Sequence, residues 1–164
     1  MIKNLIFSFI DLFKYNKPAR LRFVDFFRII FTKTRYQPLI FINGEIIEKK
    51  CSHSILDSRT KLDYLGIPKK LNGKSFLDIG CAEGFFLIEA NKRGAINVKG
   101  CDILESRLNI AKIVLKNWKF ISNTKVEKLS LFDIPISWKS DIVICLSVAH
   151  HLHGDYKHDT WQIL

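Results

Sequence analysis

The sequence predicts an α/β fold in which a parallel sheet is covered by flanking helices and is preceded by a basic, helical segment. From residue 75 onward, short apolar runs alternate with helical stretches, the order that builds parallel sheets with right-handed crossovers. With 48% apolar residues, 8 Gly and 4 Pro, the composition excludes collagen-like and largely disordered proteins. A chain of 164 residues can bury one core but not two ordinary ones. We therefore divide it into a segment at 1–36, a lead-in at 37–74 and one α/β domain at 75–164.

The N-terminal part carries most of the positive charge. Residues 1–74 hold 15 Lys or Arg and 6 Asp or Glu, a net charge of +9 out of +10 for the whole chain. Two helices are expected within residues 1–36, separated around Pro18, because proline cannot continue a helix. The second, at 19–31, mixes Arg with Phe and Ile. Three interpretations of this segment stay open: a helical cap on the α/β domain, an amphipathic helix on a membrane surface, and a nucleic-acid surface.

The cysteines show neither a C-x-x-C pair nor metal-ligand spacing. They are Cys51, Cys81, Cys101 and Cys145. Three of them lie in apolar runs, so we expect reduced, buried thiols, no metal site and a cytoplasmic protein, peripheral on the membrane if residues 1–36 bind lipid. Residues 1–13 lack the cleavage site of a signal peptide, and no uncharged stretch reaches the ~18–20 residues that cross a bilayer.

The lead-in is expected to contain a hairpin and a helix. Residues 39–42 are apolar and extended, and Asn43-Gly44 is a hairpin turn signal before a second extended piece at 45–47. A helical pattern follows at 54–65, and Gly66 ends it, as glycine often does.

The α/β domain shows the clearest periodicity. In the helix expected at 105–118, Leu108, Ala111 and Trp118 share one face. The final strand is a nearly continuous apolar run, which is typical of strands covered on both faces. The expected elements are strands at 75–79, 98–101, 126–131 and 141–147 and helices at 85–92 and 105–118.

A turn of small residues joins the first of these strands to its helix. Gly80, Ala82 and Gly84 let a ligand approach the backbone, and a helix N-terminus follows directly. A dinucleotide fingerprint would need a small residue at Phe85, and Glu83 within the turn would repel a pyrophosphate. The spacing therefore disfavours a nicotinamide-dependent oxidoreductase.

With the acid Asp78 two residues before Gly80, residues 75–152 resemble the class I S-adenosylmethionine-dependent methyltransferases. That resemblance implies a Rossmann-like parallel sheet with flanking helices, S-adenosylmethionine as cofactor, and Asp78 supporting the turn or the sulfonium side of the cofactor. In this family an acid after the second strand binds the ribose hydroxyls, which here is Asp102. The residues after the third strand contact adenine, which here are Phe132 and Asp133.

The resemblance also implies a substrate side after the fourth strand, where His150 or His151 would serve as a base towards a hydroxyl acceptor. The predicted catalytic residues are therefore His150 and His151. The predicted cofactor-binding residues are Asp78, Gly80, Ala82, Gly84, Asp102, Ile103, Phe132, Asp133 and Leu146.

Family members have a seven-stranded sheet, whereas this sequence reaches Leu164 about one helix after its fourth expected strand. We expect a C-terminally truncated domain, a sheet completed by a partner chain or dimer, or a noncatalytic remnant that serves as a binding or membrane-associated subunit. The acceptor stays open: residues 43–74 loosely resemble the lead-in of methyltransferases that modify small molecules, sugars or the wobble uridine of tRNA. Candidate substrates are thus a small-molecule or sugar hydroxyl and a tRNA base.

Overall fold

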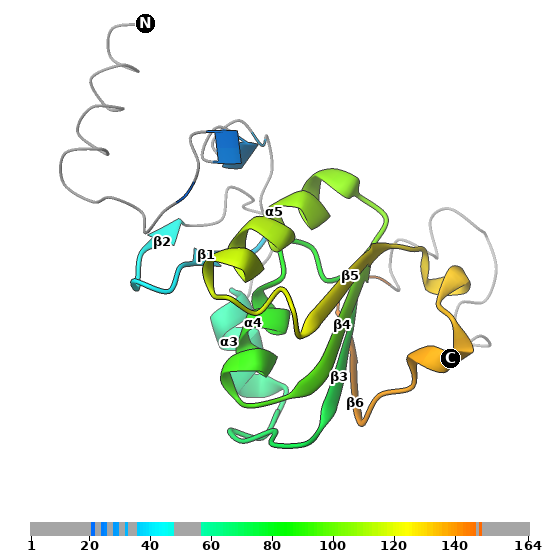
Figure 1. The fold of residues 1–164 in the computed structure, drawn as a ribbon. Helices are drawn as coiled ribbons and strands as arrows, with labels where there is room; N and C mark the ends of the chain where they lie inside the picture. Colours follow the sequence, from blue (N-terminus) through cyan, green and yellow to red (C-terminus); the bar gives the residue numbers. More distant parts are fainter. Residues whose placement is uncertain are drawn as a thin grey trace, which may run out of the picture.

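The computed structural model describes residues 36–47, 57–146 and 148, with six single positions between 21 and 32. Its centre is a four-stranded parallel sheet in the order β5-β4-β3-β6 (Figure 1). The strands are β3 (Ser75–Ile79), β4 (Ile96–Asp102), β5 (Thr124–Lys128) and β6 (Ile142–Cys145). The predicted α/β fold with a parallel sheet is confirmed.

The strand order places β3 in the interior of the described sheet. The chain adds β4 and then β5 on one side of β3, and returns across it to add β6 on the other. Ligands of open α/β sheets bind where the strand order reverses, outside the carboxyl ends of the strands. That position here is the end of β3, between β4 and β6.

Helices cover one face of the sheet. They are α3 (Ser58–Tyr64), α4 (Phe85–Lys92) and α5 (Glu105–Asn117), which lie together on one side in Figure 1. The buried stripe of α5 includes Leu108, Ala111 and Val114, as its periodicity predicts. Phe76 and Val98 from the sheet join the same core.

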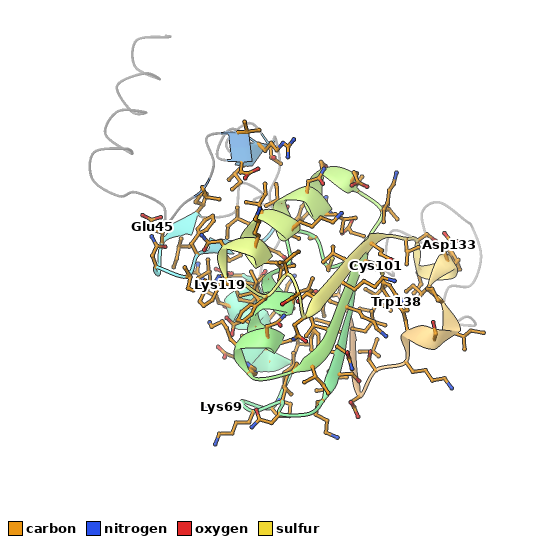
Figure 2. All side chains as sticks on the ribbon, viewed as in Figure 1. Glu45, Lys69, Cys101, Lys119, Asp133 and Trp138 are labelled. Atoms are coloured by element: carbon orange, nitrogen blue, oxygen red, sulfur yellow. The ribbon has the colours of Figure 1, made fainter. Side chains whose placement is uncertain are left out.

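The opposite face is covered by the segment between β5 and β6, which forms two short 3₁₀ turns, η1 (Leu131–Asp133) and η2 (Ile136–Trp138). Trp138 is buried with Leu77 and Cys101 in a small second core (Figure 2). In the described part of the chain, this face is therefore covered by two short turns and a few apolar contacts.

The predicted hairpin is confirmed in the lead-in. Strands β1 (Leu39–Ile40) and β2 (Ile46–Ile47) pair antiparallel around the Asn43-Gly44 turn. Two hydrogen bonds fasten the hairpin to the end of α5: the Trp118 Nε1–H donates to the Ile40 carbonyl at 2.6 Å, and the Ile42 N–H donates to Asn117 Oδ1 at 3.0 Å.

Three strand predictions need correction. The second strand is not at 98–101 but at Ile96–Asp102, because Ile96 already pairs with Ser75, and the last is not at 141–147 but at Ile142–Cys145. The third strand is not at 126–131 but at Thr124–Lys128, because Thr124 pairs with Val98 and Ser130 already caps the η1 turn through its side chain. The last strand is not covered on both faces, since Val143 is 52% exposed and Cys145 is also exposed. Strand β6 lies at an edge of the described sheet, which explains both exposures.

Parts of other predictions lie outside the described residues. The described positions 24, 25, 28 and 29 within the expected second N-terminal helix are helical. The helix expected at 54–65 instead spans Ser58–Tyr64, because Asp57 has an extended backbone and caps the helix by accepting the Arg59 N–H at 3.1 Å. None of the helices in the described part of the chain has the length and apolarity needed to cross a membrane.

Candidate functional site

The turn of residues 80–84, here called the glycine turn, connects β3 to α4 through three left-handed backbone positions. The φ angles are +76° at Gly80, +46° at Ala82 and +85° at Gly84. Glycine adopts such angles freely, whereas an alanine is strained there by on the order of 1 kcal/mol. The sequence therefore places glycine at two of three left-handed positions and accepts strain at the third.

Both glycines also allow close packing. A Cβ at Gly80 would overlap Cγ2 of Val148, which follows β6. A Cβ at Gly84 would lie 3.0 Å from the Ala111 Cβ of α5. The turn is thus held between the end of β6 and the middle of α5.

The backbone N–H groups of Gly80, Cys81, Ala82 and Gly84 in the glycine turn have acceptors within the protein. Gly80 and Cys81 donate to the Cys101 carbonyl at 2.8 and 2.9 Å, and Gly84 donates to the Cys81 carbonyl at 2.8 Å. Ala82 donates to Asp102 Oδ2 at 3.0 Å. A phosphate-binding loop needs free N–H groups directed at the anion, so this turn is not built for a pyrophosphate.

Three buried carboxylates surround the glycine turn: Asp78, Glu83 and Asp102, each no more than 6% exposed. Burial, followed by the nearby charge of Asp102, raises the pKa of Asp78 to about 8. Burial also raises the pKa of Glu83, and the Tyr36 N–H and the Arg107 guanidinium oppose that shift. These groups favour a cationic ligand over an anion.

Asp78 is the least satisfied of the three. Its Oδ2 is buried and has no hydrogen-bond partner in the described part of the chain. A buried acceptor without a partner costs about 1–3 kcal/mol. Such an oxygen, next to a turn in which four N–H groups already have acceptors, is suited to a ligand that brings its own N–H groups.

Asp102 has a structural role at the end of β4. Its Oδ2 accepts from the Ala82 N–H at 3.0 Å and its Oδ1 from the Leu104 N–H at 2.9 Å. The predicted ribose acid therefore lies against the glycine turn, and each oxygen keeps a second lone pair. Ile103, next in the chain, is 62% exposed.

The other predicted residues are placed as follows. Phe132 and Asp133 lie in η1 after β5, with Phe132 51% exposed (Figure 2). Leu146 follows β6, and its carbonyl oxygen is 3.8 Å from where a Gly80 Cβ would be. The structure thus brings Asp78, the glycine turn, Asp102 and Leu146 together, and puts Phe132 and Asp133 after a strand that ends at the same edge. His150 and His151 lie outside the described residues and stay predictions.

Gln37 and the structural role of Glu83 were not predicted from the sequence. The Glu83 carboxylate accepts the N–H groups of Tyr36 and Gln37, and Gln37 Oε1 accepts the Phe85 N–H at 2.9 Å. One signal could have indicated this: Gly84, the N-cap of α4, has no side chain to accept the first helical N–H groups. An acceptor from elsewhere in the chain was therefore required, but nothing in the sequence says which.

With this geometry described, comparison with known proteins identifies the family. A family model described as a methyltransferase domain matches residues 70–157, more than half of the chain. The chain belongs to the methyltransferase-domain family. The predicted resemblance to class I S-adenosylmethionine-dependent methyltransferases is confirmed.

Curated relatives of this methyltransferase-family chain include two ubiquinone biosynthesis O-methyltransferases from Neisseria meningitidis, of serogroups C and A. Both are 32% identical to it over 111 residues, which is 64% of this chain and 44% of the relative. The chain therefore spans less than half the length of these relatives.

Solved structures show the same fold. A structure of WbdD has a TM-score of 0.61 at 18% identity and covers 80% of this chain and 31% of WbdD. A methyltransferase from Thiobacillus denitrificans, solved with S-adenosylhomocysteine, has a TM-score of 0.50 at 22% identity and covers 59% of this chain and 39% of its own. At these identities the likeness concerns the fold alone.

Proposed function

We propose that this chain binds S-adenosylmethionine at the ends of β3 and β4 and transfers its methyl group to an acceptor hydroxyl. One observation carries the proposal: in a methyltransferase-family fold, an Asp78 oxygen that is buried and has no partner in the described residues lies beside the glycine turn, in which the N–H groups of Gly80, Cys81, Ala82 and Gly84 have acceptors within the protein. This combination disfavours a phosphate subsite at the turn and suits a positively charged nucleoside.

The residues present fit this cofactor in charge and polarity. S-adenosylmethionine carries a sulfonium and an ammonium, and it has no phosphate. The ammonium would supply donors to the Asp78 carboxylate, and the remaining lone pairs of Asp102 would accept from the ribose hydroxyls. The exposed side chains of Ile103 and Phe132 would contact adenine, since each presents apolar surface at the same sheet edge.

The bound cofactor supplies an electrophilic methyl group, and the rest of the task is positioning. This chain must hold the acceptor in line with the methyl group at ~3–3.5 Å, an arrangement that can contribute ~7–11 kcal/mol to lowering the barrier. The tight turn, held by the Cys101 carbonyl and by Asp102, provides a rigid wall for that purpose.

For the acceptor we favour the hydroxyl of a small molecule over a sugar hydroxyl or a tRNA base. The support is the name of the curated relatives, which are O-methyltransferases of ubiquinone biosynthesis. Within this proposal His150 or His151 removes the hydroxyl proton, worth ~10²–10⁴-fold in rate. Replacing each with Ala is expected to reduce turnover and leave cofactor affinity unchanged.

Thermal unfolding with S-adenosylmethionine, S-adenosylhomocysteine and NAD tests the proposal. At ~100 times its Kd, a ligand that binds only the native state adds about 2.7 kcal/mol of stability. We expect both adenosyl compounds to stabilise the protein and NAD to have no effect. Stabilisation by NAD alone would overturn the proposal, and binding without methyl transfer to any tested hydroxyl would favour a noncatalytic binding subunit.

The basic segment at 1–36 carries a separate proposal of location, a cytoplasmic protein that associates peripherally with membranes. Its support is the mixture of Arg with Phe and Ile between residues 19 and 31. Flotation with liposomes containing anionic lipid, compared with RNA retention at several salt concentrations, distinguishes lipid binding from nucleic-acid binding.

A further inference from the structure

The lead-in and the glycine turn with the start of α4 each donate hydrogen bonds to the other. From the lead-in to the turn, the Tyr36 N–H donates to both Glu83 oxygens at 3.3 Å, and the Gln37 N–H donates to Glu83 Oε2 at 3.2 Å. From the turn back to the lead-in, the Phe85 N–H donates to Gln37 Oε1 at 2.9 Å. Residues 83–85 and 36–37 thus form a closed ring of hydrogen bonds across more than 40 positions of sequence.

This ring is buried and is supported by α5. Gln37 is 7% exposed and Glu83 is 1% exposed, so neither side chain can exchange its partners for water. The Arg107 guanidinium carbon lies 4.1 Å from the centre of the Tyr36 ring, and its charge acts on Glu83. Hydrogen bonds to buried charged groups contribute more to stability than hydrogen bonds between neutral groups do.

The ring is positioned to control the shape of the glycine turn. Gly84 lies between the two contact points, Glu83 and Phe85, and it has a φ of +85°. Glycine resists rotation about φ less than any other residue, so its angle must be fixed by what lies on either side. Asp102 fixes the turn at Ala82, and Gln37 fixes it at Phe85.

We propose that Gln37 and Glu83 are positioning residues that preorganise the glycine turn for S-adenosylmethionine, so that cofactor affinity depends on the lead-in. Gln37 lies outside the family match at 70–157, so the matched region does not hold the complete site. This inference rests on the proposed cofactor. A preorganised turn does not have to be ordered when the cofactor binds, so the free energy of binding does not include that cost. If the turn loses this order, cofactor affinity falls even where the stability of the protein changes little.

The test compares Gln37→Met with Trp118→Phe. The first keeps the side-chain volume and removes the acceptor for Phe85. The second removes the donor to the Ile40 carbonyl, at the far end of the same lead-in, and keeps an aromatic ring against Phe120. Calorimetric titration with S-adenosylhomocysteine is expected to show a Kd raised about tenfold or more by Gln37→Met and less than twofold by Trp118→Phe. Hydrogen exchange of the ligand-free protein is expected to speed up at residues 81–86 in Gln37→Met only.

Equal affinities in Gln37→Met and wild type, or equal losses in both variants, would overturn the proposal. If Gln37→Met does not fold, Glu83→Met takes its place, because it removes both oxygens that accept the Tyr36 and Gln37 N–H groups and keeps a similar side-chain volume; the same tenfold weakening is expected. If wild type itself does not bind S-adenosylhomocysteine, the proposed cofactor fails, and the exchange rates of the ligand-free variants still show whether the ring holds the turn.

Discussion

The carboxyl ends of β3 and β4 carry buried aspartates on neighbouring strands, and their surroundings differ. Asp102 accepts two backbone N–H groups, from Ala82 and Leu104. Asp78 has an oxygen without a partner in the described residues, and burial raises its pKa to about 8. Asp102 therefore uses its hydrogen bonds to stabilise the fold, whereas Asp78 keeps an acceptor available for a ligand at a cost in stability. Binding sites often hold such groups because the ligand completes them.

The largest expected effect comes from removing Asp102, the aspartate whose two oxygens both accept hydrogen bonds. Asp102→Ala leaves the Ala82 and Leu104 N–H groups without acceptors, which is expected to cost about 3 kcal/mol of unfolding free energy. Binding of S-adenosylhomocysteine should fall at least 100-fold, because both the turn and the proposed ribose contact are lost. Urea unfolding and calorimetric titration measure the two effects. Unchanged binding would refute the ribose assignment.

Replacing Asp78, the aspartate with an oxygen that has no partner in the described residues, should instead increase stability. Asp78→Asn cannot ionise, so at pH 8 we expect it to raise the unfolding free energy while it weakens the affinity for S-adenosylmethionine about tenfold or more. Chemical unfolding at pH 8 with a parallel binding titration checks this. Lower stability together with weaker binding would show that the charge of Asp78 supports the fold.

The pH dependence of the unfolding free energy should also distinguish Asp78 from Asp102. The folded protein binds a proton at Asp78 that the unfolded chain has lost between its ordinary pKa of 3.8 and about 8. This raised pKa makes the Asp78 contribution to stability decrease as pH rises through that window. Unfolding curves from pH 5 to 8 should show this slope in wild type, and a smaller one in Asp78→Asn.

Affinity for a ligand that carries an ammonium group should follow the reverse trend. Ionised Asp78 attracts an ammonium and the protonated form does not, so binding of S-adenosylhomocysteine is expected to strengthen up to tenfold per pH unit as pH approaches 8 and to release a proton. Titrations in buffers of different ionisation enthalpy count that proton. Affinity that is independent of pH would separate Asp78 from the ligand.

The smallest effect is expected within the glycine turn. Ala82→Gly removes the strain at a φ of +46° and adds freedom to the unfolded chain, so the net gain should be about 0.5 kcal/mol. Thermal unfolding in the absence of ligand measures it, with Ala111→Gly as a control on α5 that is expected to destabilise. A loss of stability in Ala82→Gly would mean that the Ala82 methyl group packs favourably.

The elements nearest the site were predictable because their signals are local. The strand Ser75–Ile79 and the helix Phe85–Lys92 have the predicted boundaries, since an apolar run, a glycine turn and a helical pattern follow one another without interruption. The start of β5 was not predictable in this way. Thr124 is a strand residue because Val98 pairs with it, and that pairing depends on a strand that is distant in sequence.

The sequence by itself determined the order of strands and helices, the positions of the glycines and the acids at the strand ends, because each depends on neighbouring residues. Tertiary structure decided what those acids do. Whether Asp78 keeps a free oxygen, and whether Asp102 is used by the turn, depends on groups brought together by parallel pairing. The contact between Gln37 and Phe85 likewise joins residues 48 positions apart, and no local pattern encodes a partner at that distance.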